Sequence, residues 1–148
     1  MEKIFEVVSI KQEIRETEHH AAWYQVKSPD DVAELARQEI GYEDREIFFI
    51  ACLNTKNHVI AIHKAHVGSL NSSIVSVGDV YKTAILNNAC SIICFHQHPS
   101  GDTTESQPDI NVTKRLREAG QIMGIPLLDH IIVSFTGKYT SLKEKGYL

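Results

Sequence analysis

The residues best suited to chemistry gather in one stretch, FHQHPSGDTTESQPD, which runs from Phe95 to Asp109 directly after an apolar segment. In an extended segment, residues two apart point to the same side, so His96 and His98 would present two imidazoles together. Asp109 lies at the predicted start of the next helix, and the loop between can bring its carboxylate over both rings. Two histidines and one carboxylate, with a fourth position open, are a typical ligand set of catalytic zinc. The stretch therefore predicts a metal site.

Helix capping is a simpler explanation of part of the same stretch. Ser106-x-x-Asp109 has nearly the spacing of a capping box, with Asp109 at the third helical position and Pro108 in the first turn. A lone His-x-His at the end of a strand also occurs often by chance. Each fragment alone is weak evidence for a metal site. The two fragments together, at this spacing, are much more specific.

The joint pattern resembles a known family. His96-Gln97-His98, seven residues and then Ser106-x-x-Asp109 resemble the JAMM motif of the JAB/MPN metalloproteases. Residues 28–148, with segments such as FFIACLNTKNHVIAIHKAHVGSL and HQHPSGD, resemble the C-terminal domain of bacterial RadC-like proteins. The resemblance implies an α/β, single-domain JAB/MPN (cytidine-deaminase-like) fold, a mixed β-sheet flanked by helices, after an N-terminal extension over residues 1–27. The deaminase signatures His-x-Glu and Pro-Cys-x-x-Cys are absent from the sequence.

The resemblance also implies roles for individual residues. It makes three residues ligands of Zn2+, namely His96, His98 and Asp109. It makes Glu46 of DREIFF the base that activates a water molecule, and Ser106 the donor that stabilises the oxyanion. The implied reaction is hydrolysis of a peptide or isopeptide bond in a peptide or protein. Without the family, Glu46 is an ordinary solvated charge at a strand edge.

The chain departs from the RadC-like pattern in places. Gln97 replaces the usual asparagine between the histidines, and we expect its side chain to point away from them with little effect. Asp129 and His130 belong to the pattern, and their place in a predicted strand fits either support of the ligands or an ordinary structural role. Full-length RadC-like proteins have a DNA-associated helix-hairpin-helix region, which residues 1–27 do not resemble. An alternative function stays open: a non-catalytic binding module in DNA repair or replication.

Helices and strands of an α/β domain must position these residues. Ser28 and Pro29 begin a predicted helix that ends at Gly41, and two β-rich runs around NTKN predict a hairpin. Helices are predicted over residues 77–89 and 109–124, and strands over 90–95 and 125–135, the latter followed by a further strand or hairpin around residues 139–142. Residues 4–15 alternate enough to predict a further strand or hairpin arm. The predicted order, β-α-β-β-α-β-α-β, implies a mixed sheet covered by helices.

Composition limits the remaining possibilities. The chain has 148 residues, 15 basic and 19 acidic side chains and a net charge of -4, which suit one domain and give little support for DNA as a partner. No apolar run approaches the ~20 residues that span a bilayer, and the N-terminus lacks a signal-peptide pattern, so a cytoplasmic location is expected. Cys52, Cys90 and Cys94 show no Cys-x-x-Cys spacing and are expected to be buried structural thiols. The sequence leaves the oligomeric state open.

Overall fold

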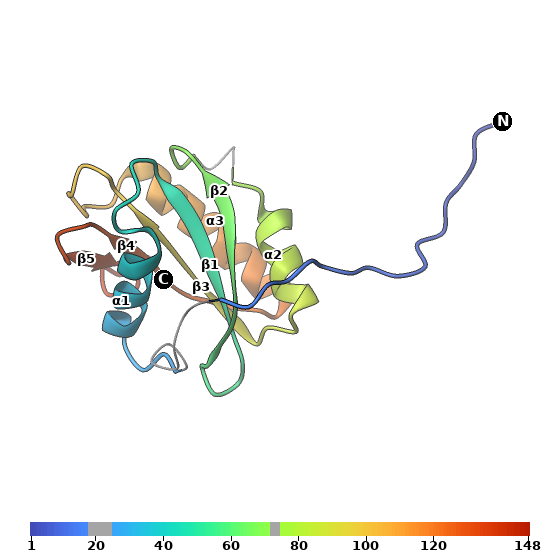
Figure 1. The fold of residues 1–148 in the computed structure, drawn as a ribbon, viewed down its shortest axis with the longest axis horizontal. Helices are drawn as coiled ribbons and strands as arrows, with labels where there is room; N and C mark the ends of the chain where they lie inside the picture. The colour runs from blue at the N-terminus through green and yellow to red at the C-terminus, as the bar shows by residue number, and fades with distance from the viewer. Residues whose placement is uncertain (18–24, 72–74) are drawn as a thin grey trace.

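A computed structural model describes residues 1–17, 25–71 and 75–148. In chain order its elements are α1 (Pro29–Ile40), β1 (Ile47–Leu53), β2 (Val59–Val67), α2 (Val77–Leu86), β3 (Ser91–Gln97), α3 (Gln107–Met123), β4 (Leu127–Val133) and β5 (Tyr139–Ser141). The five strands form one sheet in the order β2-β1-β3-β4-β5 (Figure 1). Only β3 and β4 are parallel among the strand pairs of the described residues. The predicted mixed sheet flanked by helices is confirmed.

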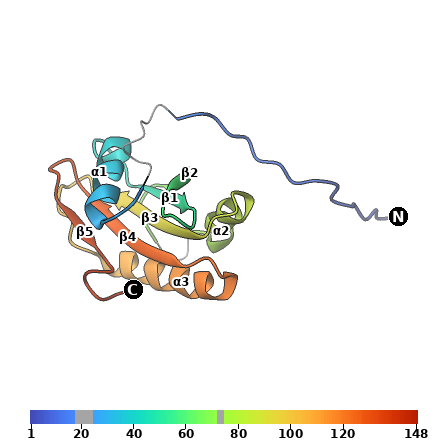
Figure 2. The same ribbon diagram turned by 90° about the horizontal axis from the view of Figure 1, so that it is seen from below.

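Helices cover both faces of the sheet, with α1 on one face and α2 and α3 on the other (Figure 2). On the α1 face, Leu35 and Ile40 belong to the same apolar cluster as Phe49 and Phe95, whose rings stack with centroids 5.4 Å apart. On the other face, the Tyr81 hydroxyl donates a hydrogen bond to a backbone carbonyl of α3 at 2.9 Å. All seven residues of β1 and all seven of β3 are buried, as expected for central strands covered on both faces.

Local signals set several element boundaries as predicted. Helix α1 begins at Pro29 after the N-cap Ser28 and gives way to Gly41. In the NTKN turn, Asn54 Oδ1 accepts hydrogen bonds from the backbone N–H groups of Lys56 and His58, at 2.9 and 3.0 Å. Asn57 has a φ of 60°, a left-handed conformation that asparagine tolerates better than most residues. The turn between β1 and β2 is therefore stabilised by its own residues, which is why the hairpin could be predicted from the sequence.

The strand predicted over residues 4–15 is wrong. In the described residues 1–17 the chain is extended and exposed and has no strand partner, and Figure 1 shows it running away from the domain. Its described links to the domain include two hydrogen bonds, at 3.0 and 3.2 Å, between the side chains of Gln12 and Asn87. An alternating pattern makes a strand only where another strand accepts its backbone hydrogen bonds, and periodicity does not reveal whether such a partner exists.

The cysteine prediction is correct for two of the three thiols. Cys52 and Cys94 are buried, and burial raises the pKa of Cys52 to about 11 and that of Cys94 well above its usual value. Cys90 is exposed, because it lies between the end of α2 and the start of β3. In the described part of the chain, no helix has the length and apolar character needed to cross a membrane.

Candidate metal centre

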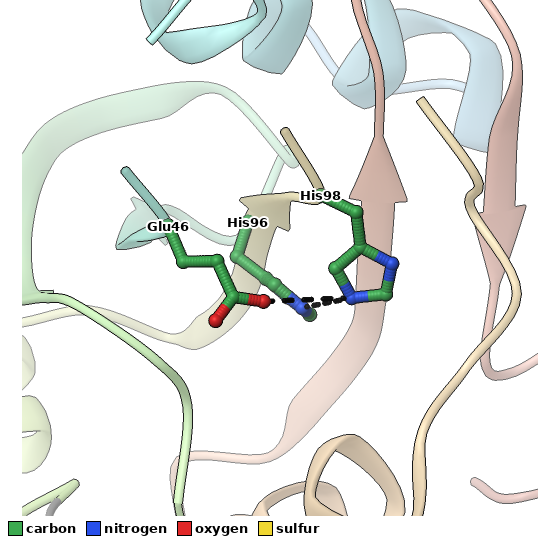
Figure 3. Close-up of side chains that lie close together, drawn as sticks. All are labelled: Glu46, His96 and His98. Carbon is green, nitrogen blue, oxygen red and sulfur yellow. Dashed lines mark hydrogen bonds and ion pairs between the residues drawn. The ribbon is translucent and has the colours of Figure 1, made fainter. Parts of the chain in front are cut away.

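The antiparallel pairing of β1 with β3 brings Glu46 beside the two histidines. Phe48 pairs with His96, so the residue before β1 lies close to the residue after β3. Glu46 Oε1 is 3.8 Å from His98 Nε2. One possible ligand atom from each of Glu46, His96 and His98 lies within 4.8 Å of the others, and Figure 3 shows the three side chains converging. Glu46 is far from the two histidines in sequence and is brought to them by the register of β1 against β3.

Asp109 reaches the same cluster from the first turn of α3. Its Oδ1 is 3.1 Å from His96 Nε2, and its Oδ2 is 3.2 Å from His98 Nε2. The two histidine Nε2 atoms are 3.2 Å apart. The Asp109 side chain is 1% exposed and the Glu46 side chain 24% exposed, so the aspartate lies on the protein side of the cluster and the glutamate toward solvent.

Ser106 is the N-cap of α3. Its Oγ accepts a hydrogen bond from the Asp109 backbone N–H at 3.2 Å, and Asp109 Oδ2 accepts one from the Ser106 backbone N–H at 2.8 Å. The capping box is therefore present, and it is compatible with a metal site because the capping carboxylate also contacts His98. Ser106 Oγ acts as an acceptor in the cap, so its O–H proton takes no part in that bond. The catalytic role of Ser106 stays a prediction.

A backbone carbonyl fixes the tautomer of His98. His98 Nδ1 lies 2.7 Å from the carbonyl oxygen of Asp102, which can only accept a hydrogen bond. Nδ1 must therefore carry a proton. When the ring is neutral, Nε2 has a free lone pair, and this lone pair is directed at the cluster.

A buried relay fixes the tautomer of His96. Thr113 Oγ1 donates to the Asp109 carbonyl oxygen at 2.7 Å, so the hydroxyl must accept from His130 Nδ1, 2.6 Å away. His130 Nε2, which is 2.7 Å from His96 Nδ1, is then an acceptor, and His96 Nδ1 carries the proton. The Nε2 lone pair of His96 therefore also faces the cluster. His130, whose role the sequence left open, supports a predicted ligand.

The ionisation of these groups agrees with the relay. Burial, with a contribution from His96, holds the pKa of His130 well below its usual value, which keeps this ring neutral. Burial opposes the ionisation of Asp109, but the hydrogen bonds that protonated His96 and His98 donate to its carboxylate outweigh burial and hold the pKa of Asp109 well below its usual range. The hydrogen bond with Asp109 raises the pKa of His98 despite partial burial. An ionised carboxylate thus attracts a positive charge, either a proton or a metal ion, to the histidine nitrogens.

Sequence reasoning missed Thr113 and left Asp129 undecided. Thr113 is four residues after Asp109 in the same helix, and this spacing could have indicated a bond to the Asp109 carbonyl. Asp129 does not contact the cluster directly in the described bonds. Its carboxylate accepts hydrogen bonds from the His130 N–H at 2.7 Å, the Ser141 hydroxyl at 2.6 Å and the Lys143 N–H at 3.1 Å. Asp129 thereby joins β4 to β5 and holds the backbone of His130.

The donor set fits a metal ion. With both rings neutral, two nitrogen lone pairs and an ionised carboxylate lie 3.1 to 3.2 Å from one another with no proton between them. The two lone pairs and the carboxylate repel one another unless a cation lies among them. Two imidazoles and a carboxylate are ligands that zinc accepts, and a partly exposed carboxylate beside them is available for proton transfer. The described residues could therefore hold one metal ion.

Comparisons with known proteins show which family this chain resembles. Residues 26–147 match the RadC-like JAB domain. A UPF0758 protein of Desulfitobacterium hafniense is 50% identical over 123 residues, which are 83% of this chain and 54% of that protein. UPF0758 proteins of Caldanaerobacter subterraneus and Listeria monocytogenes are both 52% identical, over 84% and 82% of this chain and 53% and 54% of their own lengths. The chain spans about half the length of the curated relatives it matches.

Proposed function

This chain belongs to the RadC-like JAB domain family, and from that premise we propose that it is a zinc-dependent hydrolase of amide bonds. The observation that supports the proposal most is the convergence of His96 Nε2, His98 Nε2 and the Asp109 carboxylate, with both nitrogens unprotonated when the rings are neutral. Zinc is the metal proposed, because two histidines, one carboxylate and an open position are its common catalytic ligand set.

Glu46 is the proposed base. Zinc, when bound, acidifies a water molecule and polarises the carbonyl of a substrate. Glu46 Oε2 accepts a hydrogen bond from the Leu70 backbone N–H at 3.2 Å, which leaves Oε1 facing the histidines. In this position, Glu46 can take a proton from the water at Oε1 and return it to the leaving amine. Its partial exposure also places it where a substrate arrives from solvent.

Ser106 is the proposed oxyanion donor. The cap uses its Oγ as an acceptor, so the hydroxyl proton can be donated to the charge that develops on the substrate carbonyl. The N-cap geometry holds this hydroxyl beside Asp109, which is the third residue of α3. Ser106 would therefore act in both helix capping and catalysis.

The proposed substrate class is a peptide or an isopeptide-linked protein. Peptide and isopeptide libraries incubated with the zinc-loaded wild type and with Glu46→Gln test both the reaction and the base. We expect cleavage by the wild type that a chelator abolishes and zinc restores, and no cleavage by Glu46→Gln. Equal cleavage by the two proteins would show that Glu46 is not the base or that a contaminant is active. No cleavage, together with salt-dependent DNA binding that survives Glu46→Gln, would favour a binding module instead.

A further inference from the structure

Gln97 continues the pairing of β1 with β3 through its side chain. The backbone ladder of these strands ends at the pair of Phe48 with His96. Ile47 and Gln97 would form the next facing pair, but the Ile47 N–H instead donates to Gln97 Oε1 at 2.8 Å. Gln97 Nε2 donates to the backbone carbonyl of Arg45. One side-chain amide thus takes the place of a peptide group, and it bonds the residues immediately before and after Glu46.

Gln97 holds this position in the interior of the domain. Its exposure is 0%, and its backbone pairs with Val133 of β4 in parallel register. The following residue, His98, also donates its N–H to the Val133 carbonyl, at 3.1 Å. Past His96, the main chain of β3 therefore bonds to β4, while the side chain of Gln97 bonds to the segment that contains Glu46.

Glu46 is held on its other side by residues that follow β2. Its carbonyl oxygen accepts a hydrogen bond from the Gly68 N–H at 2.7 Å, and its carboxylate accepts one from the Leu70 N–H at 3.2 Å. These bonds link Glu46 to the β2 side of the sheet. The bonds of Gln97 link the same segment to β3, which contains His96 and is followed directly by His98.

We propose that Gln97 is a positioning residue that holds the Glu46 carboxylate at its working distance from His96 and His98. The expected effect of Gln97 on turnover rests on the proposed function. Its expected effect on the backbone around Glu46 is independent of that function. Loss of both amide bonds frees residues 45–47 on the β3 side. Because a displacement of about 1 Å at a catalytic group lowers rates by about 100-fold, turnover is expected to fall with little change in substrate binding.

Gln97→Met tests the inference, because methionine has a similar length and no amide. Gln97→Glu is a second variant, which keeps an acceptor for the Ile47 N–H but cannot donate to the Arg45 carbonyl when ionised. The matched control is Tyr81→Phe, which also removes a buried hydrogen bond from a side chain to the backbone, in this case to Leu116. Amide exchange at Ile47, zinc content, kcat and KM are measured on all four zinc-loaded proteins.

For Gln97→Met we expect Ile47 amide exchange at least about 10-fold faster and kcat lower by roughly 10- to 100-fold, with KM and zinc content unchanged. Gln97→Glu should retain most of the Ile47 protection, and Tyr81→Phe should match the wild type at Ile47. A folded Gln97→Met protein with unchanged Ile47 exchange, or with wild-type kcat, would overturn the inference. If the wild type cleaves nothing, the proposed function fails, and the Ile47 exchange of Gln97→Met against Tyr81→Phe alone decides the positioning role.

Discussion

Replacing Thr113 with valine separates the relay behind His96 from the ligands themselves. Valine has nearly the shape of threonine but lacks the hydroxyl that accepts from His130 Nδ1 and donates to the Asp109 carbonyl, at 2.6 and 2.7 Å. Thr113 is 0% exposed, so the substitution leaves the ring Nδ1–H of His130 without its partner in the interior. An unsatisfied buried donor costs about 1 to 3 kcal/mol of stability, and we expect a loss in this range.

The same substitution should also weaken metal binding. Without Thr113, His130 can move its proton to Nε2, where it would donate to His96 Nδ1. His96 would then carry its proton on Nε2, the nitrogen that faces Asp109. Loss of such a supporting contact typically lowers metal affinity by about 10- to 100-fold, and this is the expected effect on zinc.

Three measurements check the relay: unfolding in denaturant, competition for zinc with a chelator, and the ring nitrogen shifts of the histidines in metal-free protein. The matched control is Thr83→Val, because Thr83 makes the same type of bond to the carbonyl four residues earlier in α2, at 3.4 Å, away from the cluster. If Thr113→Val keeps the Nδ1–H tautomer of His96 and wild-type zinc affinity, the relay does not determine which nitrogen of His96 is free to bind zinc. A change equal to that of Thr83→Val would indicate an effect on the helix alone.

The remaining predictions concern the proposed ligands, base and oxyanion donor. Glu46→Gln should keep zinc and lose nearly all turnover, whereas His98→Ala and Asp109→Ala should lose both, as metal content and kcat on one preparation will show. Ser106→Ala should lower kcat by ~10²- to 10³-fold and the free energy of unfolding by ~1 kcal/mol, so a melting curve accompanies the kinetics. An unchanged kcat would show that Ser106 acts only as a helix cap. In metal-free protein the raised pKa of His98 means that its pair with Asp109 stabilises the fold below the pKa of the unfolded chain, and that this contribution disappears as the pH rises through the folded pKa. Zinc affinity has the opposite sign and should weaken as the pH falls below that raised pKa, because zinc requires unprotonated Nε2; constant affinity between about pH 8 and pH 5 would contradict this.

The parts of the site that lie close together in the sequence could be predicted from it. His96 and His98 alternate at the end of one strand, and Ser106 and Asp109 have the spacing of a helix start, so local geometry alone brings them near one another. Glu46 could be proposed only through the family resemblance, because its approach depends on the register of β1 against β3. The helices and strands after residue 28 could be predicted from local signals in the same way.

The contacts that support the site could not be predicted, because they depend on packing between elements. The relay through Thr113 and His130 joins α3 to β4, and neither residue indicates its partner. Alternation predicts the side of β3 on which Gln97 lies, but not that its amide bonds to the backbone of the neighbouring strand. The prediction of a strand at residues 4–15 was wrong for a related reason, because an alternating pattern contains no information on a pairing partner.

Zinc content tests the central claim most directly, namely that Glu46, His96, His98 and Asp109 surround one zinc ion. Protein purified without added metal is analysed for elements and then titrated with zinc after chelation, beside the variants Glu46→Gln and Asp109→Ala. We expect about one zinc per chain in the wild type and in Glu46→Gln, and little in Asp109→Ala. Less than about a tenth of an equivalent in the wild type, with no tight uptake on titration, would contradict the claim. Full zinc content in Asp109→Ala would contradict it as well.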